Sequence, residues 1–361
     1  MNHPFSRRTL LGMAAGSAAL HRAPLSFAQQ LQTPAAPVPG FGYDKRSTVA
    51  LIHGEDRRKN VYESLVAIDD LIRPRLKNKK YVVIKPNNVS TVNPLAATHA
   101  DALRGMLDYL DGRFKGPVVI AESSAGNTPE GFENFKYNVV ASEHRSQKVS
   151  LIDLNTEGKY EVFPVLDANL HPAPVRLAAR LLDPEAFVLC AACMKTHNVV
   201  ISTLSVKNMC LGAPLRSAPK EKARWNDKRQ YHGGVRQTHY DIMLTAQKLA
   251  PFWGATVIDG YEGMEGNGPG SGTPVPSRVA IASTDYIAAD RVGVEAMGVN
   301  PNWIGYLKFC NQAGIGQYDL EKIDIRGEKV AAIKKEYRLH RDIERELRWM
   351  GSMDEVPEKL G

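Results

Sequence analysis

The sequence has little that points to a nucleic-acid partner. It contains no clustered basic helix and no zinc- or RNA-binding signature, and its formal charge is only +7 over 361 residues. Three of the positive charges, Arg7, Arg8 and Arg22, fall within residues 1–28, which contain no acid, so the remainder carries 7 − 3 = +4. We therefore expect no nucleic-acid function.

Cysteine is also scarce. The chain has four cysteines and no Cys-rich ferredoxin run, so it cannot supply two iron–sulfur clusters. Cys190 and Cys193 form a C-x-x-C, but the preceding "AFVL" predicts an extended strand, on which residues three apart point to opposite faces. They are expected to be buried structural cysteines, and a disulfide to Cys210 or Cys310 stays open.

The composition is that of a folded protein. With 43% hydrophobic and 24% charged residues, the chain is long enough for one large α/β domain or two smaller ones. Disorder of the whole chain is excluded, and no internal repeat is visible.

The N-terminus carries the most specific local pattern. In "SRRTLLGMAAGSAAL" paired arginines precede an apolar run, residues 9–20, that is well short of the ~20 residues needed to span a bilayer. We predict that residues 1–28 are a twin-arginine export signal cleaved near Ala28, with the translocation machinery as a partner and no stable membrane span. The alternative is an ordinary secretory signal. Either way, the mature protein is expected to be periplasmic or otherwise exported.

After a Pro- and Gly-rich linker at residues 29–46, strand-like and helix-like segments alternate. The strand candidates are short β-branched runs: "TVALIHG", "YVVIKPN", "GPVVIAESS", "VSLIDL", "AFVLCAAC", "ATVIDG" and "RVAIAST". The helix candidates are residues 60–75, 98–112, 237–250, 285–298 and 302–314. This alternation predicts an α/β fold over residues 47–327, a mostly parallel sheet flanked by helices, in one lobe or in two lobes with a cleft.

Polar residues follow one predicted strand after another. In a parallel sheet the carboxyl ends of the strands meet at one edge, so these side chains are expected to converge there. The candidates are Lys85, Asn87, Asn88, Lys195, Thr196, His197, Lys207, Asn208, Asp259, Glu262, Asn267 and Asp285.

These landmarks resemble a known family. "IKPNN", "MKTHNVVISTLSVKNMCLG", "IDGYEGMEGNGPGSG" and "STDYIAADRVGVEAMG" are similar, in order and spacing, to the domain of unknown function 362 family, from about Thr48 to about Gly327. The resemblance implies a fold and a set of matched positions, but the family name assigns no activity. Some members carry ferredoxin segments, which this chain lacks.

The lysines of the set favour an anion. Lys85, Lys195 and Lys207 would together hold a carboxylate or phosphate, with Asn87 and Asn208 orienting it by hydrogen bonds. A buried lysine with a depressed pKa could also act as a base or form an imine. The alternative for each single lysine is a surface residue or the partner of a structural carboxylate.

The other candidates have two interpretations each. Asp259 would bind substrate, work opposite a lysine in acid–base catalysis, or join a divalent-cation site, so the metal is left open. Asp285 fits a helix N-cap as well as a ligand. His197 would be a general base, a metal ligand or a loop histidine with a structural role. The loop "GNGPGSG", which contains Asn267, would cradle phosphate or simply turn the chain.

Two segments outside the set have their own predictions. The basic loop "RSAPKEKARWNDKRQYHGG" would close over an anionic ligand, although a solvated surface excursion is the default interpretation. Residues 328–361 form a charged C-terminal tail with apolar residues at helical spacing. An amphipathic helix docked on the core or on a second subunit is expected, which leaves a homo-oligomer open.

Three functions agree with the sequence. The first is an exported enzyme of unassigned reaction that uses the lysine and aspartate cleft on a small anionic molecule or cofactor. The second is a non-catalytic periplasmic binding or carrier protein. The third is a metal or iron–sulfur-linked redox protein. The cofactor is not determined by the sequence.

Overall fold

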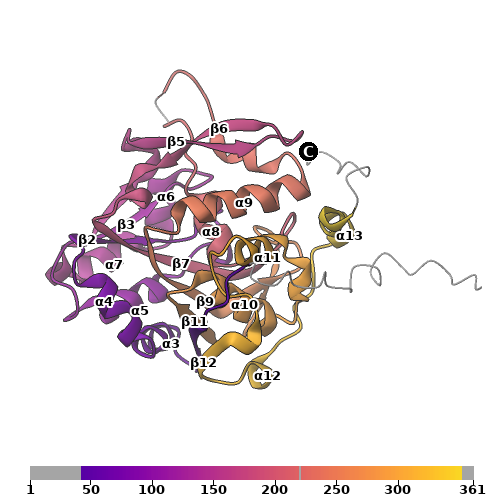
Figure 1. The fold of residues 1–361 in the computed structure, drawn as a ribbon. Coiled ribbons are helices and arrows are strands. Elements are labelled where there is room, and N and C mark those ends of the chain that lie inside the picture. The colour runs from indigo at the N-terminus through magenta and orange to yellow at the C-terminus, as the bar shows by residue number, and fades with distance from the viewer. Residues whose placement is uncertain (1–41, 219–220, 352–361) are drawn as a thin grey trace, which may run out of the picture. The chain divides into compact units, whose positions relative to one another are not determined.

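The fold is organised around one large mixed sheet (Figure 1). The computed structural model describes residues 42–218 and 221–351, which all belong to one compact unit, Pro39–Gly361. The predicted α/β class is confirmed, and the described residues form one unit rather than two lobes. The predicted signal, residues 1–28, and residues 29–41 of the predicted linker lie outside the described part.

Ten strands belong to this sheet, in the order β12-β1-β11-β9-β7-β2-β3-β4, with β10 paired to β9 and β8 paired to β7. Its strands are β1 (Ser47–His53), β2 (Tyr81–Lys85), β3 (Val118–Glu122), β4 (Ser150–Asp153), β7 (Ala186–His197), β8 (Ile201–Thr203), β9 (Trp253–Glu265), β10 (Thr273–Val275), β11 (Val279–Ser283) and β12 (Ile323–Gly327). All seven strand predictions fall on members of this set.

The central strands are apolar at consecutive positions because both faces of the sheet are covered. Val82 and Ile84 of β2 point into one hydrophobic core, and Val83 between them points into the other. The first core packs against α3 (Arg57–Val66), α4 (Asp69–Leu76), α5 (Ala100–Leu110) and α7 (Tyr137–Glu143). The second packs against α8 (Ser205–Gly212), α9 (Val235–Leu249), α10 (Tyr286–Ala296) and α11 (Gly305–Gln312).

Strand β11 runs against the others. All neighbouring pairs along the order above are parallel except the two that β11 makes, with β1 and with β9. Its last residue, Ser283, lies opposite Thr256, near the start of β9. The residues that follow β11 therefore lie at the opposite edge of the sheet from the carboxyl ends of β2, β3, β7 and β9.

This reversal removes Asp285 from the site candidates and confirms its other interpretation, a helix N-cap. Its carboxylate caps α10 by accepting the N–H groups of Ile287 and Ala288, both at 3.0 Å, and it also accepts from the Ser47 hydroxyl at 2.5 Å. Asp285 is therefore a structural N-cap far from the other candidates.

A separate two-stranded sheet was not predicted. Strands β5 (Tyr160–Leu166) and β6 (Pro172–Ala178) pair antiparallel beside α9, as Figure 1 shows. The short helix α6 (Thr128–Asn134) was also not predicted. Several β5 residues are exposed, so this hairpin does not display the apolar run that marked the central strands.

The C-terminal segment differs from the single helix expected. It forms the short helices α12 (Val330–Ile333) and α13 (Ile343–Glu346), joined by an extended stretch. That stretch is held by backbone hydrogen bonds, from the Tyr337 N–H to the Met297 carbonyl at 2.9 Å and from the Gly266 N–H to the Arg338 carbonyl at 2.7 Å. Because these partners lie on the core, the backbone is satisfied without a helix.

No helix among the described residues has both the length and the apolar character needed to cross a membrane.

The last residues of the predicted linker contact the core. The Tyr43 N–H donates to the Asn311 carbonyl at 2.8 Å.

Candidate functional site

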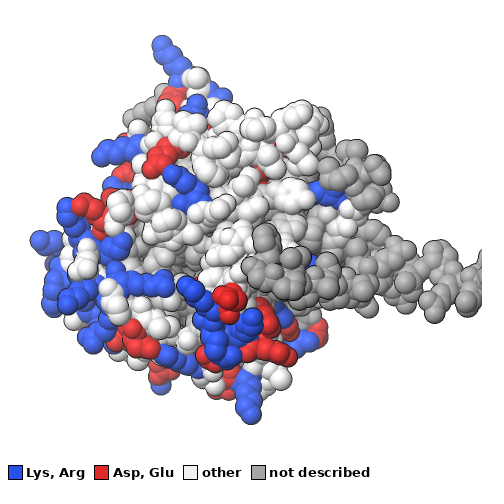
Figure 2. Space-filling view, viewed as in Figure 1, with Lys and Arg blue, Asp and Glu red and all other residues white. Residues whose placement is uncertain are grey.

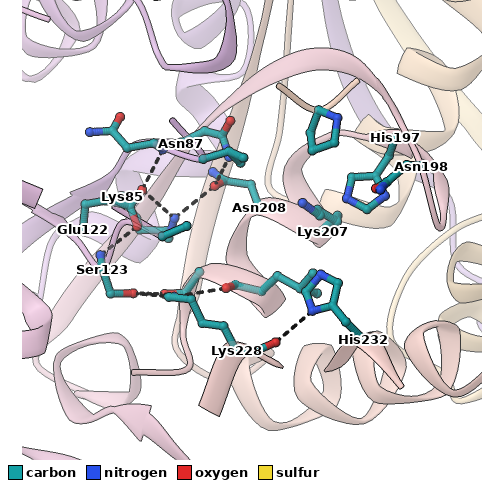
Figure 3. Close-up of a pocket in the computed structure, with 16 residues that line it drawn as sticks. Lys85, Asn87, Glu122, Ser123, His197, Asn198, Lys207, Asn208, Lys228 and His232 are labelled. Atoms are coloured by element: carbon teal, nitrogen blue, oxygen red, sulfur yellow. Dashed lines mark hydrogen bonds and ion pairs between the residues drawn. The ribbon is translucent and has the colours of Figure 1, made fainter. Parts of the chain in front are cut away.

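A cavity of about 260 Å³ opens where β2, β3 and β7 end and α8 begins. We call it the lysine cavity (Figure 3). Its polar lining residues come from segments far apart in the sequence: Lys85, Asn87, Asn88, Glu122, Ser123, His197, Asn198, Lys207, Asn208, Lys228 and His232. Six of the predicted candidates are in this set, and five other members were not selected from the sequence.

Lys85 is fully paired. Its Nζ lies 3.0 Å from Glu122 Oε2, 3.0 Å from Asn208 Oδ1 and 2.7 Å from the Pro86 carbonyl, with the side chain 1% exposed. Gly212 of α8 passes directly over this ammonium, and a Cβ at Gly212 would collide with it. The buried lysine therefore depends on a carboxylate from β3 and on a glycine in α8.

Lys195 lies behind the cavity wall rather than in it. Its Nζ donates to Asn87 Oδ1 at 2.5 Å and to the Ala96 carbonyl at 3.0 Å. The Asn87 amide in turn donates to Asn208 Oδ1 at 2.9 Å. Burial lowers the pKa of Lys195, and the neighbouring Lys85 adds to this effect. Its role is to orient Asn87, which does line the cavity.

Lys228 comes from the basic loop, and its position corrects the default interpretation of that loop as a solvated excursion. Its Nζ donates to the Pro214 carbonyl at 2.6 Å, to Ser123 Oγ at 2.9 Å and to the Leu211 carbonyl at 3.2 Å. Burial lowers the pKa of Lys228 to about 7. The end of the basic loop is therefore fastened to the cavity floor.

Lys207 is different from these three lysines. It is 5% exposed, it lines the cavity, and its Nζ has no hydrogen-bond or ion-pair partner within residues 42–218 and 221–351. Burial lowers the pKa of Lys207 well below its usual value, and Lys195, Lys85 and Lys228 lower it further. No carboxylate opposes this effect.

The helix that carries Lys207 is fastened by a residue outside the cavity. Asp290 of α10 accepts the N–H of Ser205 at 2.8 Å and that of Val206 at 3.0 Å, and it also accepts from the Ser205 hydroxyl. These bonds satisfy donors in the first turn of α8. Burial raises the pKa of Asp290 to about 7.

Two histidines flank Lys207, and their hydrogen bonds fix opposite tautomers. His197 Nδ1 lies 3.0 Å from the N–H of Val199, which can only donate, so this nitrogen accepts and Nε2 carries the hydrogen. His232 Nδ1 lies 2.9 Å from the carbonyl oxygen of Lys228, which can only accept, so this nitrogen carries the hydrogen and Nε2 has the lone pair. Burial lowers the pKa of both rings, and Lys207 adds to this effect, so both are neutral.

Asp259 and Glu262 do not reach the lysine cavity. They line a second cavity of about 190 Å³, together with Arg57, His99 and Cys193. Arg57 Nε lies 3.3 Å from Asp259 Oδ2, so the aspartate is already paired with a cation. Burial raises the pKa of Asp259, and Arg57 opposes the rise. The predicted pairing of Asp259 with a lysine is therefore wrong. We call this second site the Arg57–Asp259 cavity.

Three further candidates lie outside both cavities or turn away from them. The Thr196 hydroxyl donates to the Gly266 carbonyl at 2.9 Å and holds the Gly-rich loop. Asn267 in that loop is exposed, and its side chain accepts from the Arg341 N–H at 3.5 Å. Asn88 lines the lysine cavity, but its Oδ1 accepts from the Tyr137 hydroxyl at 3.0 Å. The loop acts as a turn, which brings only Pro269 to the cavity.

The described residues do not form a metal-binding site of the expected kind. Across residues 42–218 and 221–351, no three His, Cys, Asp or Glu side chains are grouped so that they could hold a metal ion. All four cysteines are buried and unpaired; the burial of Cys190 and Cys193 was predicted from their strand, whereas the sequence leaves a disulfide to Cys210 or Cys310 open.

The cavity residues missed by sequence reasoning had a weak signal. Glu122 ends β3 as Lys85 ends β2, and Ser123 comes next, so the strand-end argument included them although they were not chosen as candidates. Lys228 and His232 lie in a short 3₁₀ helix after a long loop, where no periodic pattern marks them. Only a folded structure brings this loop back to the sheet.

Comparison with known proteins gives a family and little more. The family model described as a domain of unknown function (DUF362) matches residues 82–295, more than half of the chain. No curated protein matches the sequence. A crystal structure of a Thermotoga maritima protein from a structural genomics consortium is 12% identical, with a TM-score of 0.38, and the match covers 62% of this chain and 55% of that one. The chain thus spans about half the length of that protein, and this likeness carries no functional inference.

Proposed function

Because this chain belongs to the domain of unknown function 362 family, whose description assigns no activity, we propose its function from the lysine cavity: it binds a small organic anion there. Six predicted positions and a large excess of cationic side chains meet in this cavity. The proposal concerns binding, and catalysis enters only through the Lys207 amine.

One observation carries the proposal: Lys207 Nζ has no hydrogen-bond or ion-pair partner among the residues that the structure describes. An ammonium group buried without a counter-charge costs several kcal/mol, so the amine either loses its proton or meets an anion supplied by a ligand. Glu122, a carboxylate that lines the cavity, is already paired with Lys85. A ligand that carries negative charge would therefore relieve the repulsion among these lysines, whereas a cationic ligand would increase it.

The cavity volume limits the size of the ligand. At about 260 Å³ it lies below the range of roughly 300–1,000 Å³ that holds drug-sized ligands. Leu211 and Pro269 add apolar surface to the lining. A short-chain carboxylic acid fits these conditions better than a dinucleotide.

Calorimetric titration with oxalate, pyruvate and inorganic phosphate tests the proposal. We expect binding of at least one of these anions by the wild-type protein and a roughly ten- to hundredfold lower affinity in Lys207→Met, since a hydrogen bond to a charged group contributes about 1.5–3 kcal/mol. The control is Lys222→Met, an exposed lysine in the basic loop, which should bind like the wild type. Equal affinities in wild type and Lys207→Met would contradict the proposal.

A stability measurement separates a binding role from a structural one. Lys207 Nζ makes no hydrogen bond or ion pair within the described residues, and Met keeps most of the apolar stem, so Lys207→Met should melt at nearly the same temperature as the wild type. Native mass spectrometry of protein from its own cells would identify a retained ligand. A large fall in melting temperature would instead assign Lys207 to the fold.

We also propose that the protein is exported through the twin-arginine route, on the basis of Arg7, Arg8 and the short apolar run behind them. The substitution of both arginines by lysine should keep the chain in the cytoplasm. Cell fractionation of the full chain and this double variant would measure the change. Export of both forms in equal amounts would exclude the route.

A further inference from the structure

We propose that the lysine cavity performs covalent chemistry, in which the Lys207 amine forms an imine with the carbonyl carbon of a small oxo acid. This inference rests on the proposed function, because the acid group of the substrate is what brings it into the cavity. It adds a nucleophile, a reaction step and a substrate class to an anion site.

The four lysines of this region differ in whether the amine is available. The Nζ atoms of Lys85, Lys195 and Lys228 each donate to two or more oxygen atoms of the protein, and these hydrogen bonds hold the three amines away from a bound substrate. Lys207 Nζ donates to none within the described residues, and its lowered pKa keeps a larger share of the amine neutral at neutral pH. Lys207 is therefore the nucleophile of the group.

The residues beside Lys207 supply what imine formation needs. Figure 3 shows Lys207 with His197, Asn198 and His232 at one end of the cavity, and Lys85 with Glu122 at the other. The fixed tautomers place an N–H donor on His197 Nε2 and a lone pair on His232 Nε2, and neither atom has a partner among the described residues. A donor can polarise the carbonyl oxygen while an acceptor takes the proton of the attacking amine.

The step balances without an oxidant or reductant. The Lys207 nitrogen gives its lone pair to the carbonyl carbon, and the carbonyl π electrons move to the oxygen, which His197 Nε2–H stabilises. His232 Nε2 accepts a proton from the nitrogen and returns it to the oxygen, which gives a carbinolamine. Loss of the second nitrogen proton with the hydroxyl releases one water and leaves the C=N bond. Hydrolysis of the imine reverses these steps.

The substrate class follows from the two ends of the cavity. The carbonyl carbon must reach Lys207, while the acid group is attracted to the Lys228 ammonium, whose partners among the described residues are all neutral oxygen atoms. Within a small cavity this requires an acid in which the carbonyl lies close to the carboxylate. Short 2-oxo acids satisfy this requirement.

Reductive trapping of the full-length protein with glyoxylate and sodium cyanoborohydride tests the inference. Reduction of the imine leaves one carboxymethyl group on the lysine that reacted, and peptide mass mapping locates it. We expect Lys207 to be modified at least tenfold faster than exposed Lys222 of the same molecule. The rate at Lys207 should rise less steeply with pH than the rate at an ordinary lysine, which has a pKa of about 10.4 and gains about tenfold per pH unit.

The outcomes separate this inference from the proposed function. Trapping at Lys207 that is suppressed by oxalate, an anion without an electrophilic carbonyl, supports both. Binding of oxalate without selective trapping at Lys207 overturns the imine and leaves an anion site. Neither binding nor trapping overturns both. Because the map is made on wild-type protein, the result does not depend on whether Lys207→Met folds.

Discussion

The lysine cavity and the Arg57–Asp259 cavity both form beside β7, yet they balance charge in opposite ways. In the second cavity each buried charge has a counterpart on the protein, with Asp259 facing Arg57 at 3.3 Å. In the first, Glu122 is the one carboxylate among the described lining residues, and it is taken by Lys85. A cavity whose charges are already paired gains little from a charged ligand. In the lysine cavity, by contrast, Lys207 has no opposite charge among the described residues.

The same contrast extends to the outer surface. In Figure 2, Lys and Arg side chains are interspersed with Asp and Glu along the left and lower parts of the molecule, whereas the centre is mostly uncharged. Ion pairs there, such as that between Arg46 and Asp324, are more than half exposed and contribute little. The informative charges of this protein are therefore the buried ones.

The largest expected effect on this comparison comes from removal of the buried carboxylates. Glu122→Gln leaves the Lys85 ammonium without a counter-charge at 1% exposure, so the free energy of unfolding should fall by about 3–5 kcal/mol. Asp259→Asn should cost less, about 1.5 kcal/mol, because Arg57 keeps contact with solvent and with the Tyr261 ring. Urea denaturation measures both. Equal losses in the free energy of unfolding would show that the buried charges of the two cavities are paired equally well.

A smaller change should follow from crowding the lysine cavity. Gly212→Ala places a Cβ against Lys85 Nζ, so the ammonium must move; we expect a loss of about 1–3 kcal/mol in stability and weaker oxalate binding. The matched control is Gly270→Ala, where a Cβ meets nothing within 4 Å. Thermal melts and calorimetry would measure the two variants. Equal stability and oxalate affinity in Gly212→Ala and the control would mean that the Lys85 ammonium can move aside without loss.

The smallest expected effect is a pH dependence from Asp290. Its folded pKa of about 7 lies above the usual value of 3.8, so its contribution to stability is present at low pH and is lost as the pH rises through about 7. The slope contributed by one group is at most about 1.4 kcal/mol per pH unit. Denaturation of wild type and Asp290→Asn between about pH 5 and 8 isolates this term. A difference between the two proteins that does not vary with pH would contradict it.

Much of the fold was predictable because the sheet is buried on both faces. Continuous apolar runs such as that of β7 identify strands directly, because both faces of such a strand are buried. The direction of a strand leaves no such mark, since an apolar run is the same whichever way it lies. For this reason Asp285, which follows β11, was grouped with residues at the opposite edge of the sheet.

The candidate site was predicted in part for the same reason. Lys85, His197 and their neighbours follow parallel strands and do meet. Helix α8 could not be recognised, because seven of its eight residues are buried and it has no polar face to reveal a helical period. Lys228 arrives through a loop whose return to the sheet depends on contacts far from it in sequence.

The attachment of α8 to Asp290 has a consequence for redesign. The first turn of this helix is secured from α10, on the side away from the cavity, so the side chains that α8 presents to a ligand do not also hold the helix start. Leu211 can thus be exchanged to accept acids of other shapes without unwinding the segment that delivers the amine, whereas Asn208 must stay because it accepts from Lys85. Specificity and scaffold are assigned to different residues of one short helix.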